Sequence, residues 1–226
     1  MPNGNLKLAL QKKGRLTEKS LQLLRNCDLD IEEYSDRLLI SAKNLELDLL
    51  FLRDDDIPEY VSDGVADIGI VGEDVIFEKR GDVNILRKLG FGKCKLSIAA
   101  PEGIKILKPE DLVNKKIATS YPNLLKKYLE EKNIKAKVVE ISGSVEITPS
   151  LGVADLICDI VSTGTTLKMN KLVKSFDIFE SETVLIGNKN LSLDAKKADL
   201  ADDLISRIDS ALIAKRSKYL MMNAPI

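Results

Sequence analysis

The sequence predicts an α/β fold with largely parallel sheets, arranged as two lobes. Short apolar runs typical of strands alternate with segments of helical period through most of the chain. The motif Gly-Val-Ala-Asp begins at Gly64 and again at Gly152, and each copy precedes an apolar strand and a glycine-containing turn. We interpret the copies as similar lobes facing each other across a cleft; coincidence on a common β-α theme is the alternative. The length of 226 residues suffices for one large domain or two modest ones.

Short apolar runs predict the strands, and periods near 3.6 residues predict the helices. Strands are expected at Leu6–Leu10, Leu47–Leu52, Asp67–Val71, Leu96–Ala100, Lys116–Thr119, Lys137–Ile141, Asp155–Val161 and Thr183–Ile186. Helices are expected at Thr17–Asn26, Ile57–Ser62, Glu73–Lys79, Asn123–Lys132 and Thr166–Leu172. A longer helix is expected within Asp194–Asn223, because Leu200, Leu204, Ile208 and Leu212 form one apolar stripe.

The composition excludes several classes of protein. Lys and Arg total 34 against 35 for Asp and Glu, so no global basic field exists to bind nucleic acid. No stretch approaches the roughly 20 apolar residues of a membrane helix. The first residues lack the order of a signal peptide. We therefore expect a soluble, cytoplasmic protein that binds neither nucleic acid nor membrane.

The lack of histidine narrows the possible chemistry. It excludes Ser-His-Asp and Cys-His hydrolases and histidine-ligated zinc. The cysteines, Cys27, Cys94 and Cys158, are odd in number and widely spaced, so we expect reduced, mostly buried thiols. Catalysis must then rely on carboxylates, Lys or Arg, backbone dipoles, or a hard metal bound by oxygens.

The strongest candidate for a binding site is the segment from Asp155 to Leu167. Strand alternation places Asp155 and Asp159 on one face, where a buried parallel strand rarely tolerates an unpaired carboxylate. A loop rich in hydroxyl groups follows where a helix should begin: Ser162, Thr163, Gly164, Thr165 and Thr166. Its N–H groups, hydroxyls and helix dipole could converge on a phosphate. Such a segment is typical of phosphoribosyl pyrophosphate (PRPP) sites, with the carboxylate on ribose hydroxyls and the loop on the 5′-phosphate. The alternative is a Ser/Thr helix cap.

Other candidates lie near the ends of predicted strands. Gln11–Leu16 holds three cations at the end of a predicted strand, where ligands bind in open α/β sheets. Lys12 and Lys13 could instead be solvated charges, while Arg15 opposes the dipole of the helix that follows. Arg53 ends an apolar strand ahead of three acids that stabilise a helix start on dipole grounds alone. Arg37 could project into a cleft or into water.

The segment Glu140–Glu146 contains a Ser-Gly-Ser turn after a predicted strand. The turn could present N–H groups to a pyrophosphate. Alternatively, Glu146 could be the capping-box acid for Gly143 or Ser142. The sequence leaves these alternatives open.

Together these segments resemble the catalytic chain of ATP phosphoribosyltransferase, the family that catalyses the first step of histidine biosynthesis. Six segments carry the resemblance in the family's order: Gln11–Leu16, Arg53–Pro58, Gly64–Asp74, Ile117–Pro122, Ser142–Glu146 and Asp155–Leu167. The resemblance implies a two-lobed fold like that of type II periplasmic binding proteins, with the active site between the lobes. We expect residues 1–90 and a returning segment 180–226 to form lobe I, and residues 91–179 to form lobe II with the PRPP loop.

The resemblance also implies a reaction. Adenine N1 of ATP displaces pyrophosphate from C1 of PRPP, with Mg²⁺ bound to the substrate, and the product is N1-(5-phosphoribosyl)-ATP. Asp159 and the loop would bind PRPP, while Arg15, Arg37 and Arg53 would face the ATP phosphates and the departing pyrophosphate. Secondary candidates are Gln11, Lys12, Glu146 and Asp155, and no protein metal site is expected.

The end of the chain, Lys218–Pro225, resembles the junction before the histidine-binding regulatory domain of long-form enzymes. We expect that domain to be absent, either by truncation or because a short form works with a regulatory subunit related to histidyl-tRNA synthetase. A homo-oligomer is the other expected assembly. A solute-binding module and a transcription factor's ligand-sensing domain are alternative functions, and the phosphate loop argues against the first and the lack of a helix-turn-helix against the second.

Overall fold

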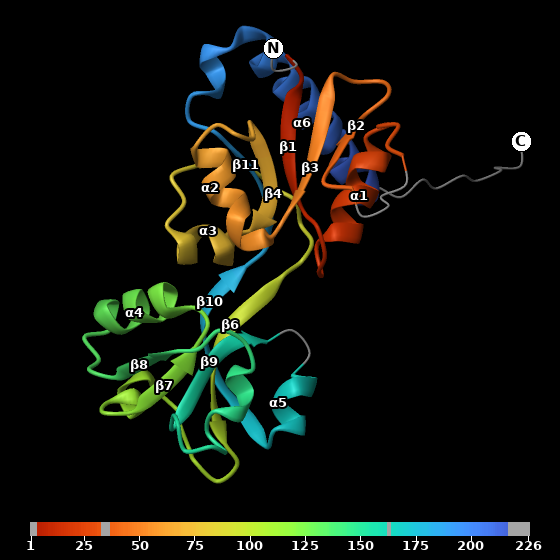
Figure 1. Cartoon of the computed structure of the whole chain (residues 1–226). Coiled ribbons are helices and arrows are strands. Elements are labelled where there is room, and N and C mark those ends of the chain that lie inside the picture. The colour runs from red at the N-terminus through yellow and green to blue at the C-terminus, as the bar shows by residue number, and fades with distance from the viewer. Residues whose placement is uncertain (1–3, 33–36, 162–163, 217–226) are drawn as a thin grey trace, which may run out of the picture. The chain divides into compact units, whose positions relative to one another are not determined.

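The computed structural model describes residues 4–32, 37–161 and 164–216, which divide into two compact units (Figure 1). Unit 1 takes its described residues from Met1–Val71, Asp82–Phe91 and Thr183–Ile226. Unit 2 takes them from Gly72–Gly81 and Gly92–Glu182. Residues 72–81 therefore belong to unit 2, whereas the predicted boundaries place them in the first lobe.

Unit 1 contains a six-stranded mixed sheet with the order β2-β3-β1-β4-β11-β5. Its strands are β1 (Leu6–Gln11), β2 (Leu39–Ser41), β3 (Leu47–Leu52), β4 (Ile68–Gly72), β5 (Asn84–Lys88) and β11 (Thr183–Gly187). Its helices and 3₁₀ turns are α1 (Thr17–Asn26), η1 (Asp54–Asp56), α2 (Ile57–Ser62), η4 (Leu191–Leu193) and α6 (Ala195–Arg216). β1 pairs in parallel with β3 and β4, while β2 is antiparallel to β3 and β5 to β11.

Strand alternation builds the core of unit 1. Alternate residues of β1 and β3 are buried on one face: Leu6, Leu8, Leu10, Leu47, Leu49 and Phe51. α1 and α6 pack against this face, and Leu204 and Ile208 of the predicted stripe are fully buried in it. The long helix begins at Ala195, and residues 217–223 of its predicted span lie outside the described residues.

Unit 2 contains a five-stranded mixed sheet with the order β10-β6-β9-β7-β8. Its strands are β6 (Cys94–Pro101), β7 (Lys116–Thr119), β8 (Lys137–Glu140), β9 (Leu156–Val161) and β10 (Leu172–Ser181). Its helices and turns are α3 (Glu73–Lys79), η2 (Pro109–Leu112), α4 (Pro122–Glu131), η3 (Val145–Ile147) and α5 (Thr165–Met169). β7 is parallel to β8 and β9, whereas β6 is antiparallel to both β9 and β10.

The two faces of this sheet have separate cores. On one face, Leu125 and Leu129 of α4 pack against β6, β7 and β9. On the other face, Val145 of η3 and Leu167 of α5 pack against small apolar residues of the same strands. α3 belongs to this unit because the Phe77 ring lies 5.3 Å from that of Phe179, in edge contact.

The repeated Gly-Val-Ala-Asp motif has the same structural role in both units. Asp67 donates its N–H to the carbonyl of Lys7 (3.0 Å) and accepts the N–H of Lys7 on its carboxylate (2.8 Å). Asp155 makes the same pair of bonds with Lys116, at 2.8 and 2.7 Å. Each aspartate therefore fastens its strand to the start of the neighbouring parallel strand.

The structure corrects several sequence expectations. The sheets are mixed, because β2 is antiparallel to β3, β5 to β11, and β6 to both β9 and β10. The sequence patterns do not predict β2, β5 and β10, since β2 and β5 are short and mostly exposed and two register shifts interrupt the alternation of β10. The helix predicted at Thr166–Leu172 ends at Met169, and Leu172 begins β10.

Two predictions about composition can be compared with the described residues. Cys27, Cys94 and Cys158 are buried free thiols in the structure, which confirms their expected burial. None of the helices that the structure describes has the length and apolar character that a membrane crossing requires.

Candidate active site

A cavity of about 100 Å³ lies in unit 2 where β9 ends. Residues from η3, β9 and α5 line it: Glu146, Asp159, Ile160, Val161, Gly164, Thr165, Thr166 and Leu167. The polar lining consists of two carboxylates and two threonine hydroxyls, and it includes no cation among the residues that the structure describes. The predicted PRPP segment and the Ser-Gly-Ser segment therefore meet at one place.

Asp159 is half-buried near the end of β9, and its carboxylate accepts the N–H of Ile160 (2.7 Å). Burial raises the pKa of this carboxyl and the negative charge of Glu146 raises it further, while the bond from Ile160 acts in the opposite direction. Desolvation penalises the charged form, so ligand groups that donate hydrogen bonds would be favoured here. Ribose hydroxyls are donors of this kind.

The turn between β9 and α5 has the backbone that a glycine allows. Gly164 has φ +74° and precedes α5 as its N-cap, and a Cβ at this position would meet no atom within 4 Å. The hydroxyl-cap alternative is therefore wrong at this position, because the cap residue has no side chain. Thr165 and Thr166 are exposed beside the cavity. Ser162 and Thr163 lie outside the described residues.

α5 has only five residues, too few for a strong helix dipole at the cavity. The macrodipole of a helix depends on several aligned peptide units. The dipole that we expected to attract a phosphate is therefore small. Backbone N–H groups and threonine hydroxyls are the donors that this turn supplies.

Glu146 and Asp155 differ in what surrounds them. Glu146 lies in η3, whose N-cap is Ser144 rather than the Gly143 or Ser142 of the capping-box alternative. Its side chain instead lines the cavity with Asp159. Asp155 lies before β9 and is bonded to the backbone of Lys116, away from the residues that line the cavity.

The first turn of unit 1 brings cations to one edge of the sheet. Gln11 pairs with Leu52 at the ends of β1 and β3, and the N–H of Lys12 continues the ladder to the Leu52 carbonyl (2.6 Å). Arg53 follows Leu52 directly. Since the carboxyl ends of parallel strands meet at the same edge, the turn that contains Arg15 begins beside Arg53.

Hydrogen bonds to Gln11 hold the backbone of this turn in place. Its Oε1 accepts the N–H of Leu16 (3.2 Å), and its backbone carbonyl accepts the hydroxyl of Thr17 (3.0 Å). Gly14 has φ +143°, and a Cβ there would lie 2.5 Å from Gln11 Nε2. Both observations explain why this turn needs a glycine and a buried glutamine.

Arg37 and Arg53 lie at the same edge. The N–H of Phe51 donates to the carbonyl of Leu38 (2.9 Å), which places Arg37 opposite the end of β3. Arg37 and Arg53 are exposed, and Arg37 also contacts Glu32 at 3.4 Å. The acids after Arg53 form η1, and the carbonyl of Arg53 accepts the N–H of Asp56 (3.1 Å).

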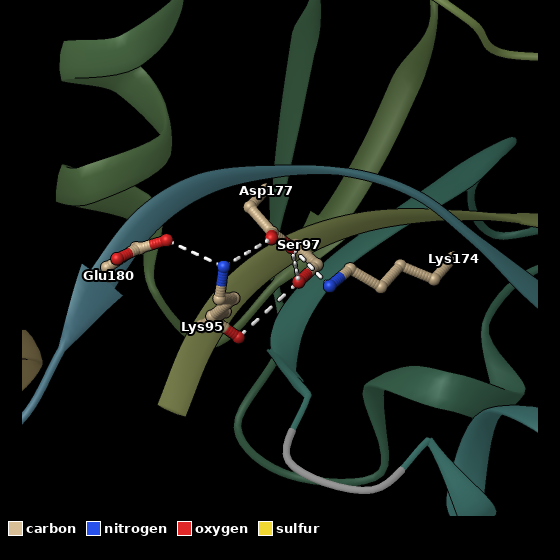
Figure 2. Close-up of polar contacts among 5 residues, drawn as sticks. All are labelled: Lys95, Ser97, Lys174, Asp177 and Glu180. Carbon is tan, nitrogen blue, oxygen red and sulfur yellow. Dashed lines mark hydrogen bonds and ion pairs between the residues drawn. The ribbon is translucent and has the colours of Figure 1, made fainter. Parts of the chain in front are cut away.

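A cluster of charged residues on β6 and β10 was not predicted (Figure 2). The Asp177 carboxylate accepts a hydrogen bond from Ser97 Oγ (2.8 Å) and forms ion pairs with Lys95 Nζ (3.2 Å) and Lys174 Nζ (2.5 Å). Its residues are far apart in the sequence, and no motif marks them. Lys174, Asp177 and Glu180, three charged residues close together in the sequence, are the signal that could have indicated a strand with a polar face.

Comparison with known proteins decides the family. A family model described as HisG: ATP phosphoribosyltransferase matches residues 53–210. A relative named ATP phosphoribosyltransferase from Cytophaga hutchinsonii is 50% identical over 220 residues, which cover 97% of this chain and 76% of that protein. The chain belongs to the ATP phosphoribosyltransferase family. Its activity is that of an ATP phosphoribosyltransferase, which joins adenine N1 of ATP to C1 of PRPP and releases pyrophosphate in the first step of histidine biosynthesis.

Solved structures confirm the predicted fold of the chain. The structure titled ATP phosphoribosyl transferase (HisG:HisZ) complex from Thermotoga maritima matches with a TM-score of 0.77 and 31% identity, covering 92% of this chain and 99% of that one. The arginine-bound form of truncated ArgBP from T. maritima matches with a TM-score of 0.57 and 16% identity, covering 94% and 96%. At that identity the second match shows the fold alone, and it confirms the predicted fold of the periplasmic binding proteins.

Proposed function

We propose that the cavity at the end of β9 binds the phosphoribosyl part of PRPP. In this proposal Asp159 accepts hydrogen bonds from the ribose hydroxyls, and Thr165 and Thr166 donate hydroxyl hydrogens to the 5′-phosphate, with Gly164 letting the backbone approach. The meeting of Asp159 and these hydroxyls in one cavity is the observation that carries the proposal. Ser162 and Thr163 are proposed to contribute as well, although they lie outside the described residues.

The cations of unit 1 are proposed to bind the charged groups that the reaction moves. Arg15, Arg37 and Arg53 would face the ATP phosphates and the departing pyrophosphate. Their approach to one edge of the sheet, through the register of β1, β2 and β3, supports this assignment. A guanidinium can donate two parallel hydrogen bonds to phosphate oxygens, so arginine suits this role.

The chemistry needs no histidine. Adenine N1 donates its lone pair to C1 of PRPP while the C1–O bond breaks and its electrons leave with the pyrophosphate. A ring nitrogen is already nucleophilic, so no general base has to create the nucleophile. Rate would come from holding N1 and C1 in line and from cations that meet the charge developing on the leaving group.

Mg²⁺ would be bound mainly by the pyrophosphate oxygens of the substrate, where it would neutralise charge on the leaving group. The described residues contain no group of three or more side chains suited to hold a metal ion. Asp159 and Glu146 are the carboxylates beside the proposed substrate position, and they are too few to form a protein metal site by themselves. These donors fit a metal that arrives with its substrate.

We further propose that this chain works with a second kind of subunit. The T. maritima structure is titled as a HisG:HisZ complex, and it matches nearly the whole of this chain. A HisZ-like regulatory subunit, related to histidyl-tRNA synthetase, is the partner proposed here. A homo-oligomer of the catalytic chain is the alternative, and the cytoplasm, where ATP and PRPP are made, is the proposed location.

The test follows product formation from ATP and PRPP with Mg²⁺ by the ultraviolet absorbance of the modified adenine, with pyrophosphatase present. Asp159→Asn is expected to weaken PRPP binding about tenfold or more, because charge-assisted hydrogen bonds to ribose are lost. Asp111→Asn is the matched control, since the carboxylate of Asp111, in η2, also accepts backbone N–H groups, those of Leu107 and Lys108. Equal PRPP affinity of Asp159→Asn and the control would refute the cavity assignment, and assays with and without a HisZ-like subunit would test the proposed partner.

A further inference from the structure

Two irregularities in β10 place three charged residues on one face of the sheet. Lys174, Asp177 and Glu180 pair with Ala99, Ser97 and Lys95 of β6, respectively. Register shifts fall between Lys174 and Phe176 and between Asp177 and Phe179. In a regular strand, residues three apart point to opposite faces, so these bulges are what keeps the charged residues together.

This face of the sheet is also the one that carries the cavity. β6 lies between β10 and β9, and Ser97 pairs with Asp177 on one side and with Asp159 on the other. Lys95 pairs with Val161, which lines the cavity together with Asp159. Residues directly opposite on neighbouring strands point to the same face. Lys95 therefore projects from the strand next to the cavity wall.

Two carboxylates hold the Lys95 ammonium (Figure 2). Its Nζ lies 2.6 Å from Glu180 Oε1 and 3.2 Å from Asp177 Oδ2. These interactions, first with Glu180 and then with Asp177, raise the pKa of Lys95. The Lys95 side chain is 45% exposed and that of Glu180 72%, and ion pairs this exposed contribute little stability. Lys95 can therefore exchange Glu180 for another anion at small cost.

The cavity needs a cation that its described lining does not supply. Its charged groups are the carboxylates of Asp159 and Glu146. A phosphate placed beside them would be repelled unless a positive charge approached. Neighbouring strands lie about 4.8 Å apart, which a lysine side chain can span. Lys95 is on the adjacent strand and faces the same way.

We propose that Lys95 is a substrate-binding residue that leaves Glu180 and contacts the 5′-phosphate of PRPP when the cavity is occupied. Glu180 and Asp177 then act as positioning residues: they hold the ammonium on the strand next to the cavity wall and compete with the substrate for it. This inference rests on the proposed PRPP site.

The test measures the dissociation constant of PRPP, with Mg²⁺, by calorimetry for wild type and a set of variants. Lys95→Met is expected to weaken binding about tenfold, and Lys95→Arg to keep most of the affinity, because a charge-assisted hydrogen bond is lost only in the first. Glu180→Gln should tighten binding about twofold, since Lys95 loses its exposed competitor. The same change in a Lys95→Met background should have no effect.

Lys189→Met is the matched control, because Lys189 pairs with Asp82 in unit 1 and is also an exposed lysine. Thermal unfolding of each variant reports whether it folds. Wild-type affinity in Lys95→Met, together with weakened binding in Thr165→Val, would overturn the role of Lys95 and leave the PRPP site standing. Tightening by Glu180→Gln in both backgrounds would overturn the competition. Failure of the wild type to bind PRPP would overturn both proposals.

Discussion

The contact between α3 and α4 allows a quantitative prediction about stability. The Glu78 carboxylate is 7% exposed and accepts the N–H of Asn123 at 3.0 and 3.1 Å and the N–H of Leu124 at 3.0 Å. Both donors lie in the first turn of α4, where N–H groups lack partners within the helix. A hydrogen bond to a charged group contributes about 1.5–3 kcal/mol, and an anion at a helix N-terminus up to about 2 kcal/mol. Because these contributions are not additive, Glu78→Ala should cost about 3 kcal/mol of folding free energy.

Circular dichroism during thermal unfolding would measure this loss. A cost of about 3 kcal/mol corresponds to a fall in Tm of roughly 6–12 °C for a chain of this size. Glu78→Gln keeps one acceptor and should lose less. The matched control is Glu131→Gln on α4, the helix that Glu78 caps. The contact of Glu131 with Lys127 at 4.0 Å is exposed, so its loss should change stability by less than about 0.5 kcal/mol. A fall in Tm for Glu78→Ala no larger than the control's would show that α4 does not depend on this cap.

Three further predictions concern buried groups. The pKa of the Asp159 carboxyl is raised in the folded state, so its contribution to stability is present below the unfolded pKa, near 3.8, and is lost as the pH rises through the folded pKa. Asp159→Asn should therefore raise Tm at about pH 8 and leave it unchanged near pH 3. Burial raises the pKa of Cys27 to about 11, so iodoacetamide at about pH 8 should leave this thiol unlabelled until urea unfolds the protein, and labelling of the native chain would contradict the buried state. Gly69→Ala would place a Cβ 2.8 Å from Ile57 Cγ2 and 3.0 Å from Val61 Cγ2, and should lower stability by about 1–3 kcal/mol in urea unfolding; an unchanged midpoint would show that α2 can move aside.

Elements with strong local patterns could be predicted from the sequence. Thr17–Asn26 and Leu47–Leu52 have in the structure the bounds that their apolar periods indicate. β10 could not be predicted in this way, because its two register shifts break the alternation by which a strand is recognised. The antiparallel pairing of β6 is likewise set by contacts between distant segments rather than by its own residues.

Some residues of the candidate site could likewise be predicted from local sequence features, whereas others could not. Asp159 and Thr165 could be proposed from one segment, since a carboxylate and a hydroxyl-rich turn at a strand end are local features. That Glu146 would line the same cavity depends on the packing of η3 on the sheet. Lys95 carried no signal of its own, because its relation to Asp159 comes from β6 lying between β9 and β10.

Comparison of the two copies of the Gly-Val-Ala-Asp motif distinguishes residues that serve the fold from a residue that lines the cavity. Asp67 and Asp155 make the same backbone bonds in the two units, so the repeated aspartate serves the fold in both. Four residues further along, the first copy has Val71, which is buried, and the second has Asp159, which lines the cavity. A carboxylate in place of an apolar residue at the end of an otherwise equivalent strand carries a cost of desolvation, visible as the raised pKa of Asp159. The position that differs between the copies, rather than the one that they share, is therefore where a function in ligand binding is to be sought.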